Sequence, residues 1–345
     1  MPAAKGEITM EPDRNGSAPA RKLAGIFRNA GRVLFVTHER PDGDALGSTF
    51  GMRAFLRAAG RGGEVLIPGE LPARYRRLCS GALRRLAPEE LEGFDLIASF
   101  DCANVARLSL PAGITVDMLR RRNFVNLDHH AGNNIDAGVN RVEPAASSTS
   151  FLAAELAREC GGGLPPEAAT LFLAGMMTDT GCFRFSNTDP ATLRRAAELL
   201  EAGADLETIS NEVFFSKPRN YAAFEADLVA NHLRLACGGR FAYANITPEL
   251  LAAHHFDLRE DEGVIDLLRE LEGVTVAMLV HRNPAGAFKV SLRSKERRHP
   301  VGPLARRYGG GGHDLAAGLT LALESFDAVD ALMEREIAAL LDSGC

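Results

Sequence analysis

Histidine and aspartate residues gather in two short stretches of this chain, about ninety residues apart. Each stretch directly follows an apolar run, at residues 33–36 and at residues 124–127. The residues are His38, Asp42 and Asp44 in the first stretch and Asp128, His129 and His130 in the second. Buried carboxylates and imidazoles are costly without partners, and together they form a common ligand set for divalent cations. The two stretches therefore predict a metal site.

Two further carboxylates have comparable positions. Asp101 ends the apolar run 96–100, and Asp179 lies where the apolar segment 167–178 gives way to a turn. A single aspartate at such a place is more often a helix cap or a turn residue than a ligand. Because four separate segments all place ligand-type side chains at the end of an element, coincidence explains the set poorly. We therefore add both aspartates to the predicted site.

Charge favours two cations over one. The carboxylates at positions 42, 44, 101 and 179 carry four negative charges when ionised, and two divalent cations cancel them. Neutral His38 and His129 complete the ligand sets. Carboxylate and imidazole ligands without cysteine favour Mn²⁺ or a related octahedral ion over structural Zn²⁺. Two metals about 3.5–4 Å apart can clamp the attacking and leaving oxygens of phosphoryl transfer, which is the chemistry we expect here.

The elements that position these groups alternate between strand-like and helix-like segments over the first two hundred residues. Such alternation is typical of βαβ units and a parallel sheet, in which ligands collect at the carboxyl ends of the strands. The predicted strands are residues 33–37, 64–68, 96–101 and 124–128. The predicted helices are residues 45–59, 148–160, 167–178 and 190–202. The predicted fold class is therefore α/β.

A different pattern follows residue 205. A polar, helical stretch without strand signal leads into a smaller α+β domain. That domain has predicted strands at 241–246, 274–281 and 287–292, a turn at 283–286, a short helix at 302–308, a glycine run at 309–312 and an amphipathic helix at 326–341. The expected organisation is a disordered tail at 1–18, a first domain at 19–204, a helical linker at 205–238 and a second domain at 239–345.

Composition narrows the class of protein. The net charge of −6 argues against a long duplex nucleic-acid footprint, but it permits a small phosphorylated ligand held by a few arginines. No apolar run approaches the roughly 20 residues of a membrane-spanning helix, and the start of the chain lacks the pattern of a signal peptide. The six cysteines form no CxxC pair, which favours reduced thiols. We expect a cytoplasmic protein.

The motifs resemble those of the DHH/DHHA1 phosphoesterase superfamily. THERPDGDALGS (37–48) looks like its first motif, FDCAN (100–104) its second, NLDHH (126–130) its third and MMTDTG (176–181) its fourth. The run GGGGH (309–313) resembles the glycine-rich signature of the DHHA1 domain. The resemblance covers nearly the whole chain. It implies a parallel-sheet DHH domain and a smaller α+β DHHA1 domain joined by a helical connector.

The family pattern also implies a role for each residue of the site. The first Mn²⁺ would be held by His38, Asp42 and Asp101. The second would be held by Asp44, Asp101, His129 and Asp179, with Asp101 bridging the two. His130 would face the scissile phosphate and stabilise its developing charge, and Asp128 would orient an imidazole by accepting its free N–H. Mg²⁺ and Co²⁺ are the alternative metals.

The residues that would bind substrate are less clearly marked. Successive glycines at Gly310, Gly311 and Gly312 let backbone N–H groups approach a phosphate, and the next residue, His313, could donate to the same anion. A mobile loop with a capping histidine is the plain alternative. Arg293 at a strand end could bind a phosphate or simply lie in solvent. Arg184, between Phe183 and Phe185, is a further candidate.

The short second domain and the FRFSNT segment (183–188) resemble the nanoRNase branch of the family, the NrnA-type oligoribonuclease/pAp phosphatases. This resemblance implies two-metal hydrolysis of very short RNA and removal of the 3′-phosphate from 3′-phosphoadenosine 5′-phosphate (pAp) in an inter-domain cleft. In enzyme terms, it implies a 3′-5′ oligoribonuclease and 3′(2′),5′-bisphosphate nucleotidase. A homodimer is expected by resemblance only.

Several other functions remain open from the sequence. Within the family they are a phosphodiesterase of pApA, pGpG or c-di-AMP, a RecJ-like single-strand exonuclease and an inorganic pyrophosphatase. The alternative from another class is a non-catalytic module that binds RNA or nucleotides.

Overall fold

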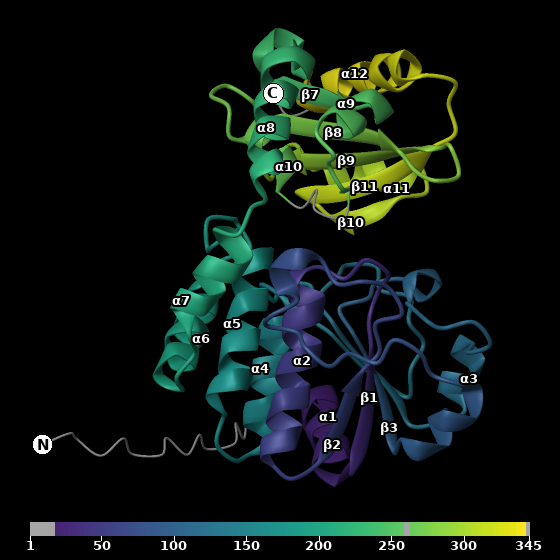
Figure 1. The fold of residues 1–345 in the computed structure, drawn as a ribbon, viewed down its shortest axis with the longest axis vertical. Coiled ribbons are helices and arrows are strands. Elements are labelled where there is room, and N and C mark those ends of the chain that lie inside the picture. The colour runs from purple at the N-terminus through teal and green to yellow at the C-terminus, as the bar shows by residue number, and fades with distance from the viewer. Residues whose placement is uncertain (1–17, 259–262, 343–345) are drawn as a thin grey trace, which may run out of the picture. The chain divides into compact units, whose positions relative to one another are not determined.

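The computed structural model describes residues 18–258 and 263–342 of the chain. These residues form two compact units, which meet in the sequence between Ser216 and Lys217 (Figure 1). Each unit contains one sheet. The expected disordered tail at 1–18 lies outside the described residues except for Ala18, which begins helix α1 (Ala18–Asn29).

The first unit is built on a five-stranded sheet in which all neighbouring strands are parallel. The strands lie in the order β2-β1-β3-β4-β5. Their bounds are β1 Arg32–Val36, β2 Gly62–Val65, β3 Leu96–Phe100, β4 Phe124–Asp128 and β5 Val139–Val142. The central strands are buried on both faces, which explains their mainly apolar sequences. The predicted α/β class with a parallel sheet is confirmed.

Helices cover both faces of this sheet, as Figure 1 shows. Side chains Val33 and Phe35 of β1 pack into a core with helices α1, α2 (Gly43–Ala58), α4 (Thr149–Cys160) and α5 (Pro166–Asp179). The alternate side chains of β1 face the opposite core, which includes helix α3 (Val116–Arg120). Helix α6 (Pro190–Glu201) packs against α5. This layering leaves the carboxyl ends of β1, β3 and β4 at one edge.

Helices α2 and α5 approach each other closely through glycines. Gly43, Gly47 and Gly51 are spaced four residues apart on α2 and therefore lie on one face. A Cβ atom added at Gly47 would lie 2.6 Å from the carbonyl oxygen of Leu171 and 2.8 Å from the Cα of Gly175, both on α5. Because no side chain fits between them, the first turn of α2 is held beside the last turn of α5.

The second unit contains a six-stranded mixed sheet in the order β10-β11-β9-β8-β7-β6. Neighbours β7 and β8 are parallel, whereas the other described pairs are antiparallel. The bounds are β6 Arg234–Ala236, β7 Phe241–Ile246, β8 Val276–Arg282, β9 Phe288–Ser294, β10 Gly311–His313 and β11 Ala316–Leu321. The predicted smaller α+β domain is confirmed, including the turn at 283–286, where the N–H of Asn283 donates to the carbonyl of Ala287.

Helices cover both faces of the second sheet as well. On one face lie α11 (Val301–Arg307) and the closing helix α12 (Phe326–Asp342), which the sequence predicts. On the other face lie α8 (Arg219–Asp227), α9 (Pro248–Ala253) and α10 (Val264–Arg269). The apolar side chains of β7 and β8 alternate between the two cores, which is the pattern of a sheet covered on both sides.

The connector at 205–238 differs from the prediction of a purely helical stretch. It contains helix α7 (Leu206–Ile209), two single π-helical turns (Ser210–Phe214 and Leu228–His232) and α8, but it ends in strand β6. Strand β6 pairs antiparallel with β7. Three residues are too few for an alternating pattern, so the sequence gives no strand signal there.

Two expectations about the whole chain concern membranes and disulfides. Among the helices of the described residues, none has both the length and the apolar character needed to cross a membrane. Cys79, Cys102, Cys160, Cys182 and Cys237 are all free thiols. The sixth cysteine, Cys345, lies outside the described residues.

Candidate active site

The six predicted metal ligands come together at the carboxyl edge of the first sheet. We call them the ligand cluster: His38, Asp42, Asp44, Asp101, His129 and Asp179. They come from the ends of three strands, the start of α2 and the last residue of α5. Two groups of three within the cluster have potential ligand atoms within 4.8 Å of one another. These groups are His38, Asp42, Asp101 and Asp44, Asp101, His129.

Asp101 is the member that the two groups share. Its Oδ2 lies 3.7 Å from Nε2 of His38, and its Oδ1 lies 3.8 Å from Nε2 of His129. The same His129 atom lies 3.8 Å from Oδ2 of Asp44 and 3.7 Å from Oδ2 of Asp179. These separations are too long for hydrogen bonds and fit atoms that surround a common cation at about 2.0–2.2 Å each.

The backbone at Asp101 has an unusual conformation. Its φ of 54° lies in the left-handed region, which costs most residues free energy but which aspartate tolerates better than most. Its N–H still donates to the carbonyl of Leu127 on β4, at 3.1 Å. The turn directs the carboxylate back over the strand ends, where it faces both His38 and His129.

Backbone carbonyls orient the imidazole ligands. Nδ1 of His38 lies 2.8 Å from the carbonyl of Glu39, and Nδ1 of His129 lies 3.2 Å from the carbonyl of Ala146. A carbonyl only accepts, so each Nδ1 carries the proton and each Nε2 is left to face the cluster. This is the tautomer that a metal-binding histidine needs.

Electrostatics in the cluster favour a bound cation. Burial raises the pKa of Asp44 well above its usual value, and the neighbouring charges of Asp101 and Asp179 raise it further. Burial also raises the pKa of Asp179 to about 6, and Asp101 and Asp42 add to this. Carboxylates this close repel one another unless protons or cations are present. The donor set therefore fits divalent cations, with oxygen and nitrogen atoms and no thiol among the ligands.

Binding of Mn²⁺ to protein stripped of metal is expected to release protons at pH 7. Burial alone would lower the pKa of His38, but Asp101 and Asp42 raise it to about 10, so the ring is protonated at pH 7 and must lose a proton to coordinate. The apparent affinity should therefore rise with pH up to about pH 10. Calorimetric titrations in two buffers with different ionisation enthalpies measure the released protons. Equal enthalpies in both buffers would contradict the expectation, and His38→Gln should release fewer protons.

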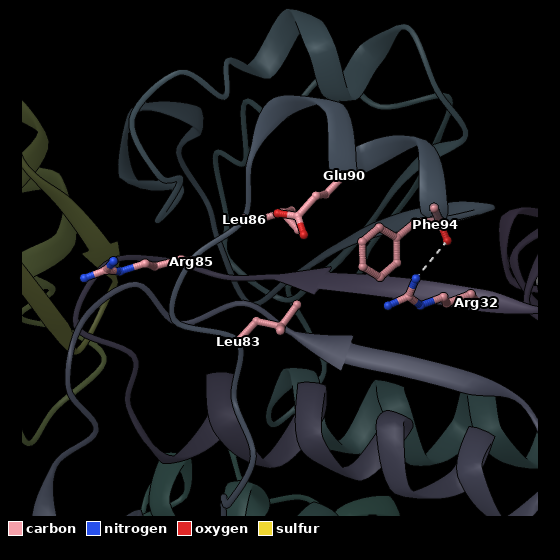
Figure 2. Close-up of a pocket in the computed structure, with 7 residues that line it drawn as sticks. Arg32, Leu83, Arg85, Leu86, Glu90 and Phe94 are labelled. Carbon is pink, nitrogen blue, oxygen red and sulfur yellow. Dashed lines mark hydrogen bonds between the residues drawn. The ribbon is translucent and has the colours of Figure 1, made fainter.

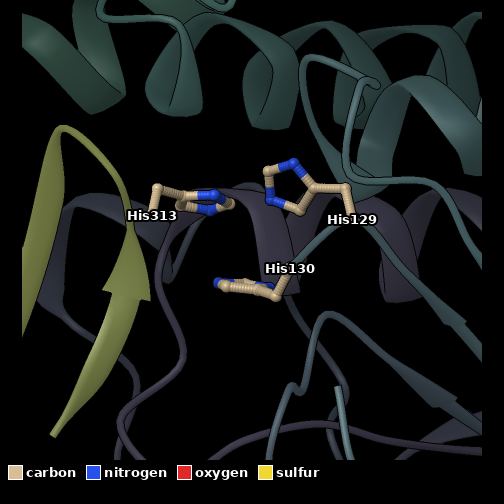
Figure 3. A group of neighbouring side chains, drawn as sticks. All are labelled: His129, His130 and His313. Atoms are coloured by element: carbon tan, nitrogen blue, oxygen red, sulfur yellow. The ribbon is translucent and has the colours of Figure 1, made fainter. Parts of the chain in front are cut away.

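Asp128 and His130 form a pair beside the ligand cluster. Oδ1 of Asp128 accepts from Nδ1 of His130 at 2.8 Å, and its Oδ2 accepts from the side-chain amide of Asn133 at 2.5 Å. Burial alone would lower the pKa of His130, but the bond to Asp128 and the charge of Asp101 raise it to about 9. Figure 3 shows the rings of His129 and His130 close together, with centroids 4.8 Å apart. The bond to Asp128 therefore orients the ring of His130 and favours its charged form.

Two of the predicted substrate residues share one face of the second sheet. Ala316 of β11 is opposite Arg293 of β9 on one side and opposite His313 of β10 on the other. Because residues directly opposite in a sheet point to the same face, Arg293 and His313 lie on one face with only the small Ala316 between them. This arrangement allows both side chains to contact one anion.

The glycine run is more regular than the predicted phosphate loop. The N–H of Gly310 donates to the carbonyl of Ala305, and Gly311 and Gly312 belong to strand β10. A Cβ atom at Gly312 would lie 2.5 Å from the carbonyl oxygen of Ala316, so this glycine is required by the close approach of β11. Substrate binding by these glycines stays a prediction. The N–H of Gly310 already donates to the carbonyl of Ala305.

Arg184 lies in the turn after α5. Its side chain is exposed, and its Nε donates to the carbonyl of Gly181 at 2.8 Å. Cys182 and Phe183 before it both have positive φ, which makes this a tight turn. Arg184 therefore belongs to the same segment as Asp179, as the sequence suggests.

The sequence analysis missed three polar residues that support the cluster. Asn133 binds Asp128, Asn187 donates to the carbonyl oxygen of Asp179 at 3.2 Å, and Thr149 donates to Asp101 at 2.9 Å. Asn133 and Thr149 lie outside the quoted motifs, whereas Asn187 lies within the FRFSNT segment, where nothing marks it out from its neighbours. No periodic pattern in the sequence marks them as supporting residues.

A separate surface pocket is lined by other residues of the first unit (Figure 2). It includes Arg32, the first residue of β1, whose guanidinium stacks on the ring of Phe94 with 4.5 Å to the centroid. The remaining lining residues are Leu83, Arg85, Leu86, Glu90 and Gly93. None of the lining residues belongs to the ligand cluster. The guanidinium of Arg32 already stacks on Phe94. The chemistry therefore lies at the carboxyl edge rather than in this pocket.

Comparisons with known proteins agree with the motifs. Residues 32–176 match the family described as "DHH family, N-terminal domain", and residues 238–339 match the DHHA1 domain. A protein of Thermus thermophilus named bifunctional oligoribonuclease and PAP phosphatase NrnA is 32% identical over 84% of this chain and 84% of its own length. The Bacillus subtilis protein of the same name is 28% identical over 87% of this chain and 92% of its own length.

A solved structure shows the same fold. An exopolyphosphatase-related protein from Bacteroides fragilis superposes with a TM-score of 0.84 at 23% identity, covering 95% of this chain and 98% of that one. The sequence relatives and the two matched domains together establish the family. The chain belongs to the DHH phosphoesterase family and is a phosphoric ester hydrolase.

Proposed function

We propose that this protein is a Mn²⁺-dependent phosphoesterase that hydrolyses short oligoribonucleotides and removes the 3′-phosphate from pAp. The observation that carries the proposal is the shared position of Asp101 between two groups of potential ligands. The substrates are proposed from the names of the relatives, which are oligoribonucleases and PAP phosphatases.

In this proposal, the residues of the ligand cluster hold two cations. The first would be held by His38, Asp42 and Asp101. The second would be held by Asp44, Asp101, His129 and Asp179. When bound, such a pair supplies Lewis-acid chemistry and neutralises charge on the phosphoryl oxygens. The protein's part is to fix the ligand geometry and to position the phosphate.

His130 would stabilise the charge that develops on the phosphate. Its Nδ1–H is held by Asp128, which orients the ring so that Nε2 would donate to a phosphoryl oxygen. Asp128 thereby acts through His130 rather than on the substrate. Because the side chain of His130 is 21% exposed, it remains accessible to a ligand.

Asp128→Asn is expected to move the alkaline limb of the pH–kcat profile to lower pH. The wild-type carboxylate raises the pKa of His130, so its removal lowers that pKa and the ring loses its proton at a lower pH. The loss in kcat at pH 8 should be about 10- to 100-fold, which is typical of removing a residue that orients a ligand or catalytic imidazole. Asp117→Asn, which removes an exposed carboxylate paired with Arg120, is the matched control. An unshifted profile would rule out this role for Asp128.

Substrate length would be limited by a second anchoring point. We propose that Arg293 and His313 bind the terminal phosphate while the cations bind the scissile one. The ligands proposed here, pAp and dinucleotides, are short and carry few phosphates. The net charge of −6 agrees, because ligands this short make few phosphate contacts.

A substrate panel tests the proposed function. pAp, labelled RNAs from a dinucleotide upward, pApA, pGpG and inorganic pyrophosphate would be compared with Mn²⁺, Mg²⁺ or Co²⁺. We expect turnover of pAp and dinucleotides with Mn²⁺, and slower turnover of long single strands. Faster cleavage of long strands would favour an exonuclease instead, and cleavage of pyrophosphate alone would favour a pyrophosphatase.

Arg293→Ala tests the second anchor. It should raise the KM for pAp and dinucleotides with a smaller effect on kcat. Arg282→Ala removes an exposed arginine from the neighbouring strand β8 and should leave the KM for both substrates unchanged. Equal KM values for the two variants would exclude Arg293 from substrate binding.

A further inference from the structure

Helix α4 begins at the ligand cluster, and its first two residues contact two of the proposed ligands. The backbone N–H groups of Thr149 and Ser150 donate to the two carboxylate oxygens of Asp44, at 2.6 and 2.7 Å. The hydroxyl of Thr149 donates to Oδ1 of Asp101, at 2.9 Å. All four residues are at most 2% exposed, so water does not compete for these bonds. Thr149 is therefore in contact with a carboxylate of each ligand group.

These contacts set the orientation of the carboxylate groups of Asp44 and Asp101. The plane of an aspartate side chain is set by a soft torsion, so an unsupported carboxylate samples many orientations. In Asp101, the present orientation directs Oδ2 toward His38 and Oδ1 toward His129. The hydroxyl of Thr149 restrains that orientation, and the N-terminus of α4 favours negative charge beside it.

The start of the helix does not need this hydroxyl for its own stability. Ser148 is the N-cap of α4, and its side chain accepts from the N–H of Phe151 at 3.0 Å. Thr149 is the next residue. At this helix start its hydroxyl donates to the Asp101 carboxylate and to no backbone group. The hydroxyl of Thr149 is thus directed at the cluster rather than at the helix.

We infer that Thr149 is a positioning residue, whose hydroxyl holds Asp101 in the orientation that bridges the two cations. The inference rests on the proposed metal site and adds a residue outside the four motifs. Removing the hydroxyl should weaken binding of Mn²⁺ by about 10- to 100-fold, as expected for a group that orients a ligand.

The experiment compares Mn²⁺ affinity in Thr149→Val and Thr149→Ser by calorimetric titration, with the thermal unfolding of each variant measured in parallel. Valine keeps the shape and removes the hydroxyl, whereas serine keeps the hydroxyl. Thr192→Val is the matched control, because Thr192 is buried in the first turn of α6 and its hydroxyl donates to Asp189 at 2.7 Å, away from the cluster. We expect weaker Mn²⁺ binding in Thr149→Val alone.

The possible results separate this inference from the proposed function. If the wild-type protein binds no Mn²⁺, the proposed metal site fails. If the wild type binds but Thr149→Val has the same affinity, only the role of Thr149 is overturned. Equal losses in Thr149→Ser or Thr192→Val would overturn it too, because the effect would then not depend on this hydroxyl. If the valine variant does not fold, Thr149→Ala removes the same hydroxyl without adding an apolar branch.

Discussion

Asp101→Asn is expected to lower kcat/KM for pAp and for a dinucleotide by about 10⁴-fold or more, the scale of loss when a central catalytic group is removed. The substitution removes the carboxylate that faces both His38 and His129. Both of the proposed cations should bind more weakly as a result. Asparagine is preferred to alanine because it is nearly isosteric and tolerates the left-handed backbone at this position. Steady-state hydrolysis with saturating Mn²⁺, together with a Mn²⁺ titration, measures the effect.

The control for this prediction is Asp136→Asn. Asp136 has an 83% exposed side chain beside Arg120 and belongs to no ligand group, so its loss should change neither rate nor affinity. An Asp101→Asn protein that retains a rate within tenfold of wild type would contradict a shared ligand at this position. It would leave the two ligand groups as separate sites.

Gly47→Ala is expected to destabilise the protein by about 1–3 kcal/mol, the usual cost of overpacking a well-packed core. The added methyl group would meet backbone atoms of α5, at Leu171 and Gly175, and backbone cannot rotate away. Helices α2 and α5 would have to separate. Because Asp44 lies in the first turn of α2 and Asp179 ends α5, metal affinity should fall as well. Chemical denaturation and a Mn²⁺ titration measure the two effects.

Gly25→Ala in α1 is the matched control with the opposite expected sign. A Cβ atom at Gly25 would meet nothing within 4 Å. The substitution should therefore stabilise the helix by about 0.5–1 kcal/mol, through the conformational entropy that glycine loses on folding. Destabilisation of both variants to the same extent would show that packing against α5 is not the cause.

The central strands of the first sheet are predictable because they are buried on both faces. β1, β3 and β4 are mainly apolar, and each predicted strand lies within one residue of its observed bounds. β5 (Val139–Val142) was missed because half of its four residues are polar and it lies at the edge. β10 was missed for a different reason. Glycine has no side chain that could show an alternating pattern, and Gly312 is required because β11 approaches it closely.

The ligand cluster was predictable to the same degree as the ends of those strands. Parallel strands bring their carboxyl ends to one edge, so His38, Asp101 and His129 had to lie near one another. The supporting residues could not be found in this way. Asn133 and Thr149 act through side-chain geometry that depends on where a loop turns and where α4 begins, and no periodic pattern encodes either.

The order in which the chain is synthesised has a consequence for when metal can be acquired. The cluster draws on residues from His38 to Asp179, and β1 must wait for β3 before the sheet can form around it. Domains generally fold as units during translation, once their last element has left the ribosome. A nascent chain that ends before α5 lacks Asp179 and the helix that packs against α2. We expect cation uptake to be the closing event of folding in this unit rather than its nucleus.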